Sequence, residues 1–169
     1  MTNIRSKTNG SIWRVAVTDL LLLGVGCSVP ALSHLLSLPL YWLNPMLWVL
    51  LLGMVLVRDR RNGYFLALLL PLFSMLVVGM PTPAKALCMV AEYAMVVFVY
   101  GRFQAWKGHL VGAMGALLVS MLCGKVVYYL LKAIVLTPAV LVGTPVLVQV
   151  LVMLASALVF AALLRRVEK

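Results

Sequence analysis

The chain has 169 residues, of which 64% are hydrophobic and only 11% charged, and its mean hydropathy is +1.11. A soluble domain of this length has too little interior to bury so much apolar surface, so the composition excludes an ordinary soluble protein. The formal net charge of +10 does not indicate a nucleic-acid partner, because the basic residues lie in short stretches between apolar runs. This placement is typical of a polytopic membrane protein.

The apolar runs are continuous and about as long as a bilayer-spanning helix, whereas the strands of a membrane β-barrel alternate apolar and polar residues. We therefore predict an all-α fold with six transmembrane helices. Residues 1–14 are expected to form a cytoplasmic N-terminal segment, residues 15–164 the transmembrane domain, and residues 165–169 a cytoplasmic tail.

The first predicted span covers about 15–36 and includes Gly24 and Ser28, whose spacing of four would let another helix approach closely. The second covers about 41–57. It opens with three residues that could either anchor the chain at the lipid interface or line a pocket, namely Tyr41, Trp42 and Asn44.

The third and fourth predicted spans cover about 64–80 and 85–100. Before them, Arg58 to Gly63 form a charged stretch in which Asn-Gly predicts a tight turn. Pro71 predicts a kink or a break in the third span. Between the two spans, a short loop supplies two candidate polar groups, Thr82 and Lys85.

The fifth span is predicted at about 109–131 and the sixth at about 139–164. Positively charged residues favour the cytoplasmic side of a membrane protein. With both termini in the cytoplasm, the opposite side carries only Lys85 and Lys132, while the cytoplasmic side carries Arg5, Lys7, Arg14, Arg58, Arg60, Arg61, Arg102, Lys107, Arg165, Arg166 and Lys169. We therefore predict this orientation.

Glu92 is the only carboxylate far from every predicted cytoplasmic end. An acid near the middle of a membrane helix costs roughly 2.5–3.5 kcal/mol on insertion scales, so Glu92 should face the protein interior or a polar cavity. Lys125 is its natural counterpart, inside the fifth span. The two residues could form a structural ion pair, contact a ligand, or lie apart.

The chain lacks the residue sets of membrane enzymes, such as His-Glu-x-x-His, Gly-x-Ser-x-Gly and a Walker loop. We expect no catalysis by this chain, no cofactor and no metal. The polar and aromatic groups near the outer half of the bundle are instead candidates for a small-molecule site, with interface anchoring or packing as the alternative for each: Tyr41, Trp42, Asn44, Thr82, Lys85, Glu92, Lys125 and Tyr128.

Four short motifs occur in a characteristic order: Asn44-Pro45-Met46, Leu70 to Ser74 followed by Gly79-Met80-Pro81, Met89 to Tyr93 followed by Tyr100-Gly101, and Gly124 to Tyr128. Together they resemble the S-components, the substrate-binding membrane subunits of energy-coupling factor (ECF) transporters. The resemblance covers residues 15–135, and length and six-helix topology agree with it. Two positions depart from the family pattern, since Leu70 replaces a serine and Lys125 replaces an arginine.

The resemblance implies a subunit in the cell membrane of a prokaryote that captures a vitamin or related micronutrient from outside. It also implies as partners a transmembrane coupling subunit, contacted here by Gly24 and Ser28, and two cytoplasmic ATPases. The alternative is a non-transporting six-span scaffold of the cell-envelope machinery, which needs no polar lining.

Overall fold

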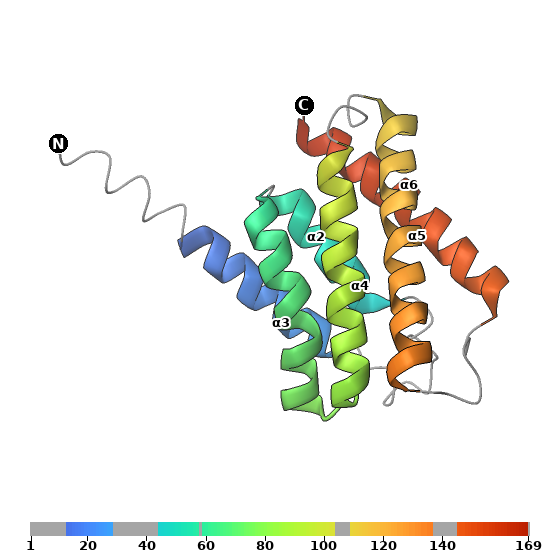
Figure 1. Ribbon diagram of the computed structural model, residues 1–169. Coiled ribbons are helices and arrows are strands. Elements are labelled where there is room, and N and C mark those ends of the chain that lie inside the picture. Colours follow the sequence, from blue (N-terminus) through green and yellow to red (C-terminus); the bar gives the residue numbers. More distant parts are fainter. Residues whose placement is uncertain (1–12, 29–43, 58, 104–108, 137–144, 169) are drawn as a thin grey trace.

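The computed structural model describes residues 13–28, 44–57, 59–103, 109–136 and 145–168, and these residues form helices and the short connections between them (Figure 1). The all-α prediction is confirmed for this part of the chain. Its elements are a helix at 13–28, α2 (Pro45–Val57), α3 (Arg60–Val78), α4 (Pro83–Arg102), α5 (Leu110–Val135) and α6 (Val146–Glu168). Residues 165–168, predicted as a tail, continue α6.

The five labelled helices pack as a closed ring. In Figure 1, α3, α4 and α5 stand side by side, and α6 crosses obliquely behind α5. The pair α4–α5 makes the most extensive contact, α6 packs on α5, and α2 closes the ring between α6 and α3. The helix at 13–28 lies against the ring, where Leu22 is buried next to Gly53 of α2.

Four of the described helices, α3 to α6, are long and apolar enough to cross a membrane. The described part of the protein is therefore that of a membrane protein. α2 has 13 residues and measures roughly 20 Å at 1.5 Å per residue, which is less than the bilayer core. The six-span topology and its orientation stay predictions.

The start of α3 differs from the sequence prediction. Asp59 caps this helix, because its carboxylate accepts a hydrogen bond of 2.9 Å from the backbone N–H of Arg61. Asn62 and Gly63 therefore belong to the first turn of α3 and do not form the tight turn that we predicted. The helix continues through Pro71 and ends at Gly79, whose φ of 75° is a left-handed cap.

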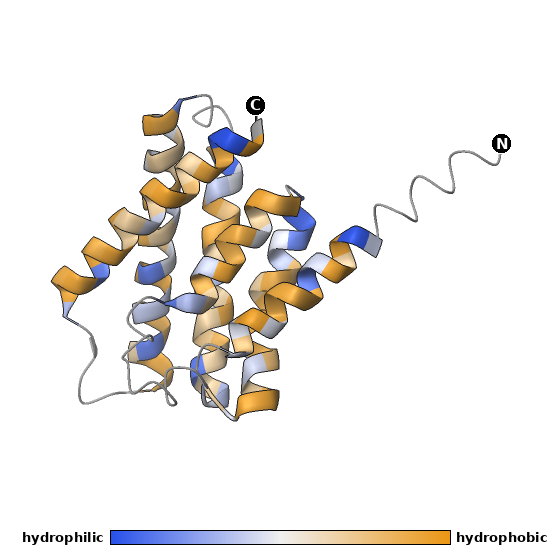
Figure 2. Cartoon of the chain, turned by 180° about the vertical axis from the view of Figure 1, so that it is seen from behind, coloured by the Kyte–Doolittle hydropathy of each residue, from blue (hydrophilic) through white to orange (hydrophobic). Residues whose placement is uncertain are grey.

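Hydrophobic residues predominate along the helices (Figure 2), and their side chains both fill the ring and cover its outside. The centre is close-packed around residues such as Leu50, Leu66 and Val96, each 0% exposed. Large apolar side chains such as Leu76 and Val111 point outward, which suits a surface in contact with lipid.

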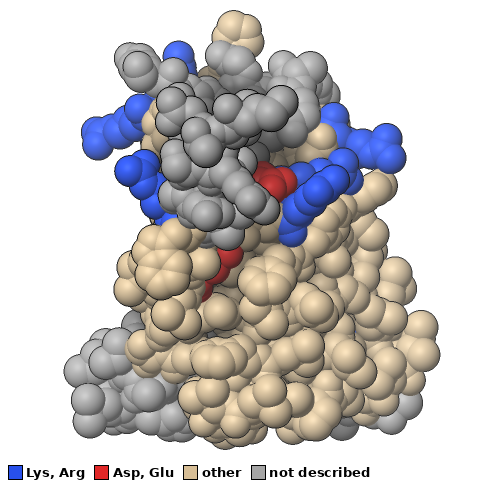
Figure 3. Space-filling view, turned by 90° about the vertical axis from the view of Figure 1, so that its left-hand side faces the viewer, with Lys and Arg blue, Asp and Glu red and all other residues tan. Residues whose placement is uncertain are grey.

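Arginine side chains gather at one end of the bundle. They lie where α3 begins and where α4 and α6 end, and Figure 3 shows basic residues above a broad uncharged surface. The opposite end carries Lys85 in the first turn of α4 and Lys132 in the last turn of α5. The long helices thus have a basic end and a weakly charged end.

Candidate functional site

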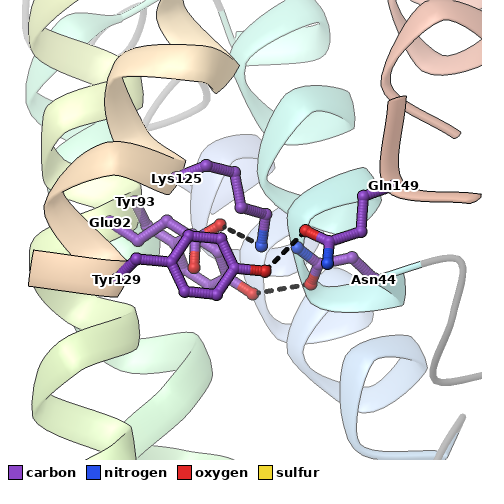
Figure 4. Close-up of polar contacts among 6 residues, drawn as sticks. All are labelled: Asn44, Glu92, Tyr93, Lys125, Tyr129 and Gln149. Carbon is purple, nitrogen blue, oxygen red and sulfur yellow. Dashed lines mark hydrogen bonds and ion pairs between the residues drawn. The ribbon is translucent and has the colours of Figure 1, made fainter. Parts of the chain in front are cut away.

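An ion pair joins α4 to α5 inside the bundle. Lys125 Nζ lies 2.7 Å from Glu92 Oε1, and the two side chains are 22% and 3% exposed (Figure 4). Of the three arrangements open at the sequence level, the structure has the pair in direct contact. An ion pair between partly or fully buried groups avoids leaving either charge alone among apolar side chains.

Gly124 explains how the two helices come close enough for this contact. A Cβ atom at this position would lie 2.7 Å from Val96 Cγ2 and 2.9 Å from the backbone oxygen of Glu92. A glycine is therefore needed where α5 crosses α4, immediately before Lys125. The close approach of the two backbones sets the position of the ion pair.

Two tyrosines near the ion pair form hydrogen bonds to neighbouring helical segments. The hydroxyl of Tyr93 donates to Asn44 Oδ1 at 3.1 Å, and the hydroxyl of Tyr129 donates to Gln149 Oε1 at 2.6 Å. Figure 4 shows these side chains and the ion pair pointing toward one another from α4, α5, α6 and the start of α2. We call the six residues of this figure the polar cluster.

Asn44 has a second role, at the start of α2. Its φ is 47°, in the left-handed region that asparagine adopts more readily than most residues. Its backbone oxygen accepts hydrogen bonds from the N–H groups of Leu47 and Trp48, at 2.9 and 3.3 Å. The backbone that begins α2 therefore also fixes the amide that meets Tyr93.

Tyr128 gives the ammonium group of Lys125 an aromatic neighbour. Lys125 Nζ lies 5.3 Å from the centroid of the Tyr128 ring, within range of a cation–π interaction. The rings of Tyr128 and Tyr129 meet edge to face, with centroids 5.5 Å apart. Lys125 is thus held between a carboxylate and an aromatic face.

Trp48 carries a buried donor that no described residue satisfies. Its indole Nε1 is buried, and within the described part of the chain it has no hydrogen-bond partner. Its ring packs edge to face on Phe160 of α6, with centroids 5.8 Å apart. Trp48 follows Asn44 by four residues, in the first turn of α2.

The structure brings only some of the predicted site residues together. Glu92 and Lys125 form the ion pair, Tyr128 contacts Lys125, and Asn44 is bonded to Tyr93, the neighbour of Glu92. Thr82 and Lys85 are exposed at the start of α4, and Lys85 precedes Glu92 by seven residues, or roughly 10 Å along the helix. They lie outside the cluster. Tyr41 and Trp42 lie outside the described residues.

The two residues predicted to contact a coupling subunit lie on an exposed side of the helix at 13–28. A Cβ at Gly24 would meet no described atom within 4 Å, and Ser28 Oγ donates to the Gly24 carbonyl at 2.5 Å. No other described residue covers this side of the helix at Gly24, so a partner protein could contact it.

Four polar residues of the site are not among the predicted site residues: Trp48, Tyr93, Tyr129 and Gln149. Tyr93 is adjacent to Glu92, and Tyr129 follows Lys125 by one turn, so helical spacing from the two charges could have indicated both. Gln149, in the sixth span, had no such neighbour in the sequence.

The polar cluster offers a carboxylate, an ammonium group, two phenols and two amides. Such groups bind the polar part of a small molecule through hydrogen bonds and charge, while the surrounding side chains are apolar. Within the described residues, no group of three or more His, Cys, Asp or Glu could hold a metal ion. Comparisons with protein-family models, curated proteins and solved structures give no match.

Proposed function

We propose that this chain is the substrate-binding membrane subunit of an ECF-type importer, which captures a vitamin or related micronutrient. The observation that carries this proposal is the convergence of ionic, phenolic and amide groups from four helical segments inside an otherwise apolar bundle. Packing alone does not need these groups, because apolar residues of similar size are often at least as stabilising as a buried ion pair.

The polar cluster would bind its ligand by exchanging partners. An anionic group of the ligand would replace Glu92 as the partner of Lys125. Alternatively, a cationic or hydrogen-bonding group would replace Lys125 as the partner of Glu92. The N–H of Trp48, which has no partner among the described residues, would supply a further donor, and the rings of Tyr128 and Tyr129 suit a planar ligand.

The remaining parts of the proposal follow from topology. We place the basic end of the bundle in the cytoplasm of a prokaryotic cell, with six spans and both termini inside, because positive residues favour that side. The exposed side at Gly24 and Ser28 would contact the coupling subunit. ATP hydrolysis would belong to two partner ATPases, and this chain would have no enzymatic activity.

One observation favours the alternative of a membrane scaffold. Each residue of the polar cluster already has a partner within the chain, which is what a purely structural role requires. In a scaffold, substitutions in the cluster would change stability and nothing else.

Native mass spectrometry of the gently purified protein separates the two functions. We expect a vitamin-sized ligand on the wild type, and its loss from folded Glu92→Gln, Asn44→Ala and Trp48→Phe variants. Ser156→Ala is the matched control, because this buried hydroxyl on α6 donates to the carbonyl of Val152 within its own helix. The control should keep the ligand.

The opposite result is equally informative. A clean apo mass, together with no shift in melting temperature against a panel of water-soluble vitamins, would reject the transporter and support the scaffold.

A further inference from the structure

Two arginines share one aromatic ring at the basic end of the bundle. Arg60 of α3 places its Cζ 5.6 Å from the centroid of the Phe98 ring, and Arg102 of α4 places its Cζ 5.0 Å from the same centroid. Arg60 also lies 5.6 Å from the Tyr64 ring. We call Arg60, Tyr64, Phe98 and Arg102 the arginine–aromatic patch.

The guanidinium group of Arg60 is fixed in place from two sides. Its Nη2 donates a hydrogen bond of 3.1 Å to the hydroxyl of Tyr64. It also lies against α4 at Gly101, where a Cβ atom would be 3.1 Å from its Nε and 3.2 Å from its Cζ. Binding at this group would therefore lose less side-chain freedom than binding at an unrestrained surface arginine.

Among the described residues, most donors of the two guanidinium groups have no hydrogen-bond partner. An arginine has five N–H donors, and the Tyr64 bond takes one of those of Arg60. Within the described residues, the one ion pair is Glu92–Lys125, so neither arginine of the patch is neutralised there. The nearby carboxylate of Asp59 instead caps α3 at Arg61. The patch is thus positively charged.

Exposed apolar side chains adjoin these charges. Tyr64 is 36% and Phe98 41% exposed, and further along α3 toward its other end Phe65 and Leu68 are 50% and 47% exposed. Both helices are long and apolar enough to cross a membrane, and the arginines lie at their ends. This places the guanidinium groups at head-group depth and the apolar side chains at acyl-chain depth.

We propose that the arginine–aromatic patch binds the head group of an anionic phospholipid. Guanidinium forks match phosphate oxygens in geometry and charge, and basic sites between membrane helices bind anionic head groups. The exposed apolar surface beside the arginines favours a lipid over free phosphate, since it contacts the acyl chains. The proposal depends on the membrane placement of α3 and α4 and is independent of transport.

Lipid retention on the full-length protein tests this proposal. The protein is purified in mild detergent and titrated with phosphatidylglycerol or phosphatidylcholine, and native mass spectrometry measures how much of each lipid is bound. We expect tighter binding of phosphatidylglycerol, and a loss of roughly thirtyfold in its affinity in the Arg60→Gln/Arg102→Gln double variant, at about fivefold per arginine. The Arg60→Lys/Arg102→Lys variant, which keeps the charge without the fork, should lose less.

Arg165→Gln/Arg166→Gln is the matched control, since it removes two exposed arginines from α6 at the same end. Equal affinity losses in the control and the patch variant would overturn the proposal, as would unchanged affinity in the patch variant. Inorganic phosphate provides a further test. If it raises the melting temperature of the wild type and also abolishes phosphatidylglycerol binding, the patch binds free phosphate and the proposal is overturned. If Arg60 variants misfold, Arg102→Gln alone serves as the test variant, because the exposed side chain of Arg102 lies over the Phe98 ring.

Discussion

The Glu92–Lys125 pair puts two opposite charges where neither is well solvated, so each depends on the other. We predict that Glu92→Gln and Lys125→Met each destabilise the ligand-free protein by about 2–4 kcal/mol, because each leaves a buried polar or charged group without its partner. The double variant should lose at least about 1 kcal/mol less than the sum of the two. Reversible unfolding in detergent, read by circular dichroism, measures all three.

The Val96→Ala variant is the control for this double-mutant cycle, because it measures the stability lost when only packing is removed. Val96 is 0% exposed beside the pair, so its loss reports packing alone. Strictly additive single effects would mean that the contact of 2.7 Å contributes nothing to stability.

The sequence was sufficient to find the two charges of the cluster, but not their hydrogen-bonded neighbours. Glu92 and Lys125 stand out because charges inside apolar spans are rare. Tyr93 and Tyr129 do not, since tyrosine is also common at the lipid interface and in apolar cores. Their roles depend on Asn44 and on Gln149, which lie 49 and 20 residues away in the chain.

At the scale of helices, Gly124 controls the distance between α4 and α5. We predict that Gly124→Ala destabilises the protein by about 1–3 kcal/mol, because the added methyl group meets the α4 backbone at Glu92 and the packed side chain of Val96. The same measurement on Gly24→Ala is the control, as a methyl group there meets no described atom within 4 Å. Equal stability of the two variants would contradict the close crossing.

A buried hydrogen bond ties the helix at 13–28 to α3. Asn62 Nδ2 donates to Asp19 Oδ1 at 2.9 Å, and both residues are at most 9% exposed. We predict that Asp19→Ala costs about 1–3 kcal/mol and speeds hydrogen exchange in residues 13–28, because the Asn62 amide loses its acceptor. Asp19→Asn keeps a carbonyl acceptor and should be milder. Unchanged exchange in both variants would contradict this role.

This contact also shows why element boundaries and pairings were harder to predict than element types. Long apolar runs predicted helices correctly throughout the described residues. Asn62-Gly63 has the composition of a turn, but with the cap at Asp59 α3 begins at Arg60, four residues before the predicted start, and both residues are buried in its first turn. The partner of Asn62 lies 43 residues away, so no local pattern could identify it.

For the whole molecule, the unequal charge of the two ends predicts its orientation in the membrane. α3 to α6 are candidate spans, and the arginine-bearing ends of α3, α4 and α6 should stay in the cytoplasm. Single cysteines at two exposed positions test this on a background in which Cys27, Cys88 and Cys123 are replaced by alanine. A membrane-impermeant maleimide should label Thr82→Cys in intact cells, and Arg166→Cys only after permeabilisation.

A third cysteine decides between four and six spans. Pro39 lies between the first two predicted spans. If both of these spans cross the membrane, this position lies outside the cell. We therefore predict that Pro39→Cys is labelled in intact cells, as Thr82→Cys is. Labelling of Pro39→Cys only after permeabilisation would mean that the helix at 13–28 and the short α2 do not cross, so that α3 to α6 alone span the bilayer. Labelling of Arg166→Cys in intact cells would show that the orientation is opposite to the predicted one. The arginine–aromatic patch would then meet lipid on the outer side of the membrane.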